Sequence, residues 1–220
     1  MKTPNYNSDK DHRSLSDAVK KEYDQQSDCY ELKWSAYLNH TYSRAVDMMA
    51  PEDGDYILDS SAGTGLFGSM LLEHARCRLV LSDFSESMLK VAKERHTGDN
   101  DGVSIVRADT HQLPFDDDLF DKIYNINALH FYANPVMALD ELVRVCKPGG
   151  HILILDWSRD YFLFRMFETA MRLFRVPTGR VFHKEELENL FREKGLTVRK
   201  ACYWRWHYWS LASLKAELPL

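Results

Sequence analysis

The 220-residue chain contains 45% hydrophobic and 28% charged residues, which is the composition of an ordinary globular protein of one domain. Its formal net charge of −5 argues against a nucleic-acid-binding surface, because phosphate backbones attract concentrated Lys and Arg. The sequence shows no membrane span and no secretory signal, and its four cysteines have neither metal-site spacing nor the pattern of a disulfide framework. We therefore expect a cytoplasmic protein that binds neither metal nor nucleic acid.

The first fifth of the chain divides into a polar tail and a helical segment. Residues 1–20 are rich in Asp, Ser and Lys, a composition that predicts a mobile tail. Residues 21–50 place apolar side chains at helical spacing, which predicts a helical lid. No second domain boundary follows, so residues 21–220 are expected to form one domain.

Residues 51–157 alternate short apolar runs with amphipathic stretches. Such alternation predicts a parallel sheet with right-handed crossovers and helices on both faces. Ligands of such sheets bind beyond the carboxyl ends of the strands. The predicted strands are 56–59, 78–83, 103–109, 121–127 and 151–157, and the predicted helices are 65–75, 85–95 and 135–146.

The last part of the chain, residues 158–220, has a different pattern. An aromatic-rich helix is predicted over 160–176, and an amphipathic helix over 183–195 ends at a glycine. Residues 196–218 alternate loosely and predict two strands. These elements and the lid are expected to form the substrate side of the domain.

The loop after the first predicted strand carries the clearest motif. Residues 63–68, GTGLFG, have the G-x-G-x-x-G pattern of dinucleotide-binding loops, but Asp59 ends the strand four residues before the first glycine. A carboxylate about 4 Å from a pyrophosphate would cost a few kcal/mol at an effective dielectric constant near 20. A phosphate-binding P-loop is excluded because Ser69-Met70 stands where Lys-Ser/Thr is required. The loop therefore favours a cationic ligand without phosphate.

The segment ILDSSAGTG, residues 57–65, resembles motif I of the class I S-adenosylmethionine-dependent methyltransferases. The usual form is apolar-apolar-Asp-x-Gly-x-Gly-x-Gly, and Ser61 replaces the first glycine. Four further segments are similar to the family in order and spacing: VLSDFSESML, VRADTHQLPFDDDLFD, FDKIYNINALHFYANP and ELVRVCKPGGHILILDW. LPFDDDLFD and RVCKPGGHILILD are typical of the small-molecule branch that includes the ubiquinone and menaquinone methyltransferases.

The resemblance covers roughly residues 50–200 and implies an α/β, Rossmann-like class I methyltransferase fold. That fold has a seven-stranded, mostly parallel sheet with an antiparallel last strand and helices on both faces. The resemblance also implies S-adenosylmethionine as cofactor, with Asp83 accepting hydrogen bonds from the ribose hydroxyls and Asp109 near the adenine amino group. The cofactor-binding residues expected from it are Asp59, Ser61, Gly63, Thr64, Gly65, Asp83, Phe84, Met88, Asp109, Thr110 and Asn125.

The expected acceptor is a small molecule, aromatic or lipophilic as in that branch. Aromatic residues concentrate in the lid and at predicted strand ends, and the substrate candidates are Tyr23, Tyr30, Trp34, Tyr132 and Trp157. Methyl transfer needs a general base only if the nucleophile must lose a proton, and His130 is the candidate. The aromatic residues also fit plain core packing, and His130 fits a role in lining the pocket or binding a backbone carbonyl.

Several alternatives remain open from the sequence alone. The chain could retain a cofactor pocket without catalysis, or use the cofactor for a transfer other than methylation. An NAD-dependent oxidoreductase is a further rival. The identity of the acceptor, the methylated atom (O, N or C) and the oligomeric state are not determined by any motif.

Overall fold

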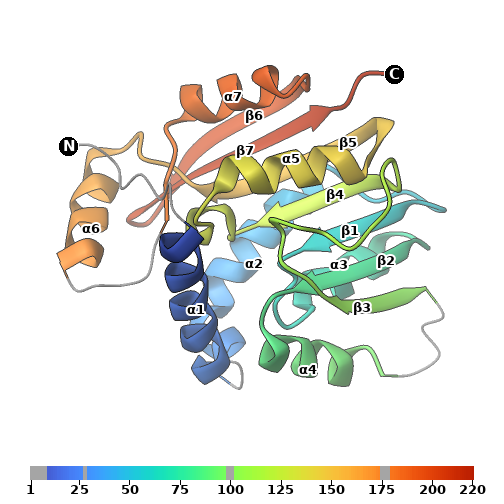
Figure 1. Cartoon of the computed structure of the whole chain (residues 1–220), viewed down its shortest axis with the longest axis horizontal. Helices are drawn as coiled ribbons and strands as arrows, with labels where there is room; N and C mark the ends of the chain where they lie inside the picture. The colour runs from blue at the N-terminus through green and yellow to red at the C-terminus, as the bar shows by residue number, and fades with distance from the viewer. Residues whose placement is uncertain (1–8, 27–28, 98–101, 174–178) are drawn as a thin grey trace.

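The computed structural model describes residues 9–26, 29–97, 102–173 and 179–220, which form one seven-stranded sheet flanked by helices (Figure 1). The strand order is β3-β2-β1-β4-β5-β7-β6, and only β7 runs antiparallel to its neighbours. This architecture confirms the predicted sheet. The strands are β1 (Tyr56–Ser60), β2 (Arg78–Asp83), β3 (Val103–Arg107), β4 (Phe120–Ile126), β5 (Cys146–Trp157), β6 (Thr197–Trp206) and β7 (Trp209–Glu217).

The helices lie over both faces of the sheet and at the carboxyl ends of its parallel strands (Figure 1). They are α1 (Asp9–Gln26), α2 (Tyr30–Met48), α3 (Leu66–His74), α4 (Glu86–Arg95), α5 (Pro135–Val145), α6 (Phe162–Leu173) and α7 (Lys184–Glu193), with a short 3-10 helix η1 (Leu129–Phe131).

Consecutive strand residues pack into two separate cores because side chains alternate across a strand. Ile57 belongs to the core beneath α2 and α3, and its neighbour Leu58 belongs to the core beneath α5 and α7. The same alternation runs through Leu153 and Ile154 on β5. A parallel strand covered on both faces must be apolar along its whole length, which explains why its sequence reads as a continuous apolar run.

Helical structure begins earlier in the chain than its composition predicted. The predicted tail ended at residue 20, but Asp9–Gln26 forms α1, and residues 1–8 lie outside the described residues. Leu15 is buried, and α1 packs against α4 and η1. Tertiary contacts thus stabilise this helix, although its composition is mostly polar and its apolar stripe is short.

Strand β5 also begins earlier than predicted, because Cys146–Gly150 continues the strand after α5 ends at Val145. The pairing of β5 with β4 jumps from Cys146–Phe120 to His151–Lys122, so the additional residues are accommodated by a bulge. A side chain at Gly150 would lie 2.8 Å from the Lys147 carbonyl oxygen and 3.1 Å from the Asp121 carbonyl oxygen. The bulge therefore requires a residue without a Cβ atom.

We expect Gly150→Ala to lower the free energy of unfolding by about 1–3 kcal/mol, because backbone atoms must move to admit the methyl group. Urea unfolding followed by circular dichroism measures the change. Ser104→Ala, at an exposed position on β3, should stay within about 0.5 kcal/mol of the unaltered protein. Equal stability of the two variants would contradict this account of the bulge.

Candidate functional site

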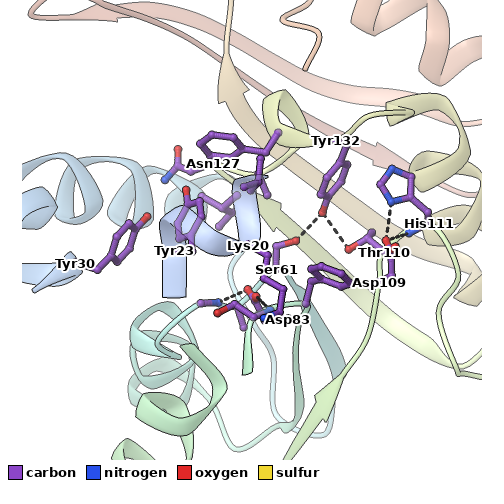
Figure 2. A pocket seen from close by; sticks show the side chains of 18 of the residues that line it. Lys20, Tyr23, Tyr30, Ser61, Asp83, Asp109, Thr110, His111, Asn127 and Tyr132 are labelled. Carbon is purple, nitrogen blue, oxygen red and sulfur yellow. Dashed lines mark hydrogen bonds and ion pairs between the residues drawn. The ribbon is translucent and has the colours of Figure 1, made fainter. Parts of the chain in front are cut away.

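A cavity lies at the carboxyl ends of the parallel strands, where the predicted ligand site was expected. Its empty volume is about 860 Å³, including the part that opens to solvent. Tyr23 and Tyr30 approach it from the N-terminal helices, and Asp109, Thr110 and His111 lie on the opposite side (Figure 2). The lining residues are Val19, Lys20, Tyr23, Tyr30, Tyr42, Ser61, Ala62, Gly63, Asp83, Phe84, Ser85, Asp109, Thr110, His111, Ile126, Asn127, Ala128, Phe131 and Tyr132.

The glycine-rich loop turns sharply over the end of β2. The backbone N–H groups of Ser61 and Ala62 both donate to the Ser82 carbonyl oxygen, at 2.8 and 2.9 Å. Gly63 has φ +55° and Gly65 has φ +73°, a left-handed conformation that glycine adopts without steric cost. Gly65 is also the N-cap of α3, so the loop passes directly into the helix. The glycines are thus required by the turn, whichever ligand it serves.

Asp83, at the end of β2, has its carboxylate fixed by two backbone N–H groups. Gly63 donates to Oδ2 and Ser85 donates to Oδ1, each at 2.8 Å (Figure 2). Burial raises the pKa of this carboxyl group, although these backbone hydrogen bonds oppose the shift. A carboxylate has about four acceptor positions, so Asp83 retains capacity for two hydroxyl donors from the cavity.

Asp59, at the end of the adjacent β1, lies behind the cavity wall and is 2% exposed. Its Oδ2 atom is buried and has no hydrogen-bond partner among the described residues. Burial, with a smaller contribution from the charge of Asp83, raises the pKa of Asp59 from 3.8 to about 8. Two neighbouring strands therefore end in carboxyl groups whose pKa values burial raises.

Tyr132 connects three loops on the far side of the cavity. Its hydroxyl contacts Ser61 Oγ at 2.6 Å and donates to Thr110 Oγ1 at 3.1 Å (Figure 2). It also accepts from Asn125 Nδ2 at 2.6 Å. Burial raises the pKa of Tyr132 to about 12, so the hydroxyl remains protonated at neutral pH. Ser61 adopts φ +76°, which costs an L-residue roughly 1–2 kcal/mol and directs its hydroxyl to Tyr132.

The loop after β3 is held by Asp109 and His111. His111 Nδ1–H and its backbone N–H both donate to Asp109 Oδ1, at 2.6 and 2.9 Å. The Asn134 backbone N–H donates to His111 Nε2 at 3.4 Å. Asp109 and Thr110 therefore face the cavity from a rigid loop.

His130 and Asp156 form a buried pair beside the cavity. His130 Nδ1–H donates to Asp156 Oδ1 at 2.5 Å, and its ring stacks on Trp157 with centroids 3.6 Å apart. Both members of the pair are 2% exposed, and His130 Nε2 has no hydrogen-bond partner among the described residues. His130 does not line the cavity, but its chain neighbours Phe131 and Tyr132 do.

The backbone of this turn is held by a residue that the sequence analysis did not identify. The Gly179 N–H donates to the His130 carbonyl oxygen at 2.7 Å. A Cβ atom at Gly179 would lie 2.3 Å from the Tyr132 carbonyl oxygen, so no larger residue fits without displacing the turn.

The aromatic candidates divide between the cavity and the core. Trp157 donates from Nε1 to the Tyr37 hydroxyl at 3.0 Å, and Tyr37 donates to Asn127 Oδ1 at 2.9 Å. Trp34 packs edge-on against Tyr37 and Trp209. Trp34 and Trp157 thus pack α2 against the ends of β5 and β7 and do not line the cavity, as the core-packing interpretation expects.

The predicted site residues accordingly form two groups. Those that line the cavity are Tyr23, Tyr30, Ser61, Gly63, Asp83, Phe84, Asp109, Thr110 and Tyr132. Those that lie behind its wall or in the core are Trp34, Asp59, Thr64, Gly65, Met88, Asn125, His130 and Trp157.

Val19 and Lys20 were not predicted as site residues because both fall in the predicted tail. Leu15, Val19 and Tyr23 recur at four-residue intervals, and this short apolar stripe was the signal that could have found α1. In the structure, Val19, Lys20 and Tyr23 line the cavity.

Comparisons with known proteins concern the sequence and the fold. The family model described as a methyltransferase domain matches residues 58–154. The chain is 32% identical over 165 residues to the demethylmenaquinone methyltransferase of Streptomyces griseus subsp. griseus, covering 74% of this chain and 68% of that relative. The chain belongs to the class I S-adenosylmethionine-dependent methyltransferases. The cavity of this methyltransferase family member lies within the matched segment and the helices around it.

Other relatives extend the comparison. The chain is 40% identical over 145 residues to the demethylmenaquinone methyltransferase of Clavibacter sepedonicus, covering 66% of this chain but only 57% of that relative. The putative methyltransferase from the Haloferax volcanii Trm112 complex has a TM-score of 0.78 and 21% identity, over 90% of this chain and 98% of that one. The second likeness concerns the fold alone.

No described helix is both long enough and apolar enough to span a bilayer. The described part of the chain contains no group of three or more His, Cys, Asp or Glu side chains placed to hold a metal ion.

We expect the unfolding free energy of Asp59→Asn to exceed that of the unaltered protein increasingly as the pH rises from 4 to 8. The raised pKa means that the folded state binds a proton more tightly than the unfolded state, so stability is lost as the pH approaches about 8. At about 1.4 kcal/mol per pKa unit, the gain at pH 8.5 should exceed about 1 kcal/mol. Urea unfolding at pH 5 and pH 8.5 measures it, with the exposed Asp116→Asn as control. Parallel stabilities of both variants across this range would refute the burial argument.

Proposed function

We propose that the protein transfers a methyl group from S-adenosylmethionine to a small aromatic acceptor of the hydroquinone type. The observation that carries this proposal is the pair of carboxyl groups, Asp59 and Asp83, at the ends of adjacent strands beside a glycine-rich loop. Burial raises the pKa of both groups, so a nearby positive charge would stabilise their ionised forms. A ligand with sulfonium and ammonium groups supplies that charge, whereas a pyrophosphate adds to the repulsion.

The residues present fit the cofactor in a definite division of roles. Asp83 accepts hydrogen bonds from the two ribose hydroxyls, since its carboxylate is already oriented by the backbone N–H groups of Gly63 and Ser85. Asp109 and Thr110 contact the adenine, and Phe84 packs on its face. When bound, the cofactor supplies an electrophilic methyl group on a sulfonium that departs as a neutral thioether. The protein therefore acts mainly by aligning acceptor and donor.

The acceptor class is inferred from relatives and from the chemistry of the wall. Both curated relatives named above are demethylmenaquinone methyltransferases. On this chain Tyr23, Tyr30 and Phe131 form an aromatic wall, with Tyr23 edge-on to Phe131 at 5.4 Å between centroids. Flat aromatic rings pack well against such a wall. A hydroquinone ring carbon becomes a better nucleophile when its hydroxyl group loses a proton.

His130 is the residue that we propose to accept that proton. His130 Nδ1–H donates a hydrogen bond to the carboxylate of Asp156, which leaves the unpartnered Nε2 as the nitrogen that can accept a proton. Phe131 and Tyr132 carry the same turn into the cavity wall, which places Nε2 behind that wall and beside the ring of Trp157, so an acceptor hydroxyl contacts it only if this turn moves. The tyrosine hydroxyls do not compete, because burial raises the pKa of Tyr30 and of Tyr132 to about 12.

The first test of the proposed function is binding. Asp83→Ala should weaken the affinity for S-adenosylhomocysteine by at least about 100-fold, because two hydrogen bonds to a charged acceptor are lost. Isothermal titration calorimetry measures this, and unchanged thermal unfolding shows that the fold survives. Asp116→Ala removes a carboxylate from an exposed turn and should bind as the unaltered protein does. Unchanged affinity of Asp83→Ala would refute the role of this residue.

The second test is turnover with a 2-prenyl-1,4-naphthohydroquinone and cofactor labelled in the methyl group. His130→Gln should lower kcat about 100-fold or more and leave the affinity for S-adenosylhomocysteine within twofold. His74→Gln, at an exposed position, is the matched control. A His130→Gln variant with nearly full kcat would remove the base from the mechanism. Cofactor binding without turnover on any acceptor would instead indicate a non-catalytic protein.

A further inference from the structure

The cavity has an uneven distribution of charge that the proposed function leaves unexplained. Asp83 and Asp109 line it with carboxylates. Among the lining residues of the described chain, Lys20 carries the one ammonium or guanidinium group. Helix α1, which supplies it, also places Val19 and Tyr23 on the cavity wall. One face of α1 therefore covers the cavity and brings a single positive charge to it.

Lys20 is held in this position by a relay of hydrogen bonds. Its Nζ atom donates to Asp24 Oδ2 at 2.6 Å, one helical turn further along α1. The other oxygen of Asp24 accepts from the hydroxyls of Ser85 and Ser87, at 2.6 and 2.5 Å. Burial would raise the pKa of Asp24, but the hydrogen bonds from Lys20 and the two serines hold it at about 2. Asp24 is therefore ionised at neutral pH and anchors α1 to the start of α4.

The ammonium group of Lys20 retains capacity for a ligand. An ammonium group has three N–H donors, and Asp24 receives one of them. The side chain is 28% exposed, so it lies at the boundary of the cavity and is not sealed in the core. A carboxylate in the cavity would otherwise lose its hydration beside two other carboxylates, at a large cost in free energy.

We propose that Lys20 binds the α-carboxylate of the amino-acid end of the cofactor, with Asp24 as the residue that positions its ammonium group. This inference rests on the proposed function, since it assigns one end of the same ligand. Asp59 and Asp83 account for the cationic and ribose parts of the ligand, and Lys20 accounts for its single negative charge. Helix α1 thus closes over the cavity through a contact that only a ligand with a carboxylate completes.

The test compares two nucleosides that differ in this end of the molecule. S-adenosylhomocysteine has the carboxylate, and 5′-methylthioadenosine lacks the whole amino-acid group. Lys20→Met should weaken binding of S-adenosylhomocysteine about 10- to 100-fold, the range for a hydrogen bond between charged groups, and should change binding of 5′-methylthioadenosine less than twofold. Lys20→Arg should retain most of the affinity. Calorimetry on the full chain measures all three.

Lys21→Met is the matched control, because Lys21 is exposed on the same helix and does not line the cavity. An equal loss of affinity for both nucleosides in Lys20→Met would overturn the inference and indicate a structural role for Lys20. Unchanged affinity for S-adenosylhomocysteine would overturn it as well. Failure of the unaltered protein to bind either nucleoside would reject the proposed function itself, and this inference with it.

Discussion

Burial of Asp59 and Asp83 at the ends of adjacent strands is the constraint on which the site depends. The parallel pairing of β1 and β2 brings the two carboxyl groups to one edge of the sheet, where packing removes water from Asp59. Burial raises the pKa of both groups, so ionising them costs more free energy in the folded protein than in water. A cationic ligand would stabilise the ionised carboxyl groups and so reduce this cost.

The walls of the cavity are made rigid by hydrogen bonds between loops that are distant in sequence. The Tyr132 hydroxyl joins the glycine-rich loop, the loop after β3 and the end of β4 through Ser61, Thr110 and Asn125. Ser61 occupies a left-handed conformation that the family usually gives to glycine. Its hydrogen bond to Tyr132, typically worth about 1 kcal/mol, offsets part of the conformational cost. Serine at this position therefore costs conformational free energy but adds a fixed hydrogen bond across the cavity.

The two N-terminal helices have different relationships to the sheet. Tyr37 on α2 contacts Trp206 and Trp209 and hydrogen-bonds Asn127, so α2 is fastened by many buried contacts. Helix α1 contributes the buried Leu15 and the ring of Tyr23, and Asp24 anchors it to Ser85 and Ser87 at the start of α4.

The amino-acid sequence determined the order of elements from β1 to β7, because continuous apolar runs, amphipathic periods and glycine-rich breaks are local signals. It also determined the acidic strand ends and the glycine-rich loop, since Asp59, Asp83 and Gly63 are adjacent to those signals. It did not reveal α1, whose stripe of Leu15, Val19 and Tyr23 is short and lies among polar residues.

Only the tertiary structure decided which residues face the cavity. The sequence placed Asn125, Met88 and Trp157 near strand ends or in the adjoining helix, but packing turns them into supporting positions. Lys20 and Asp24 reach the site through contacts with α4 that span more than sixty residues of chain. Side-chain direction and long-range docking depend on the summed packing of the whole domain, and a local pattern carries no record of them.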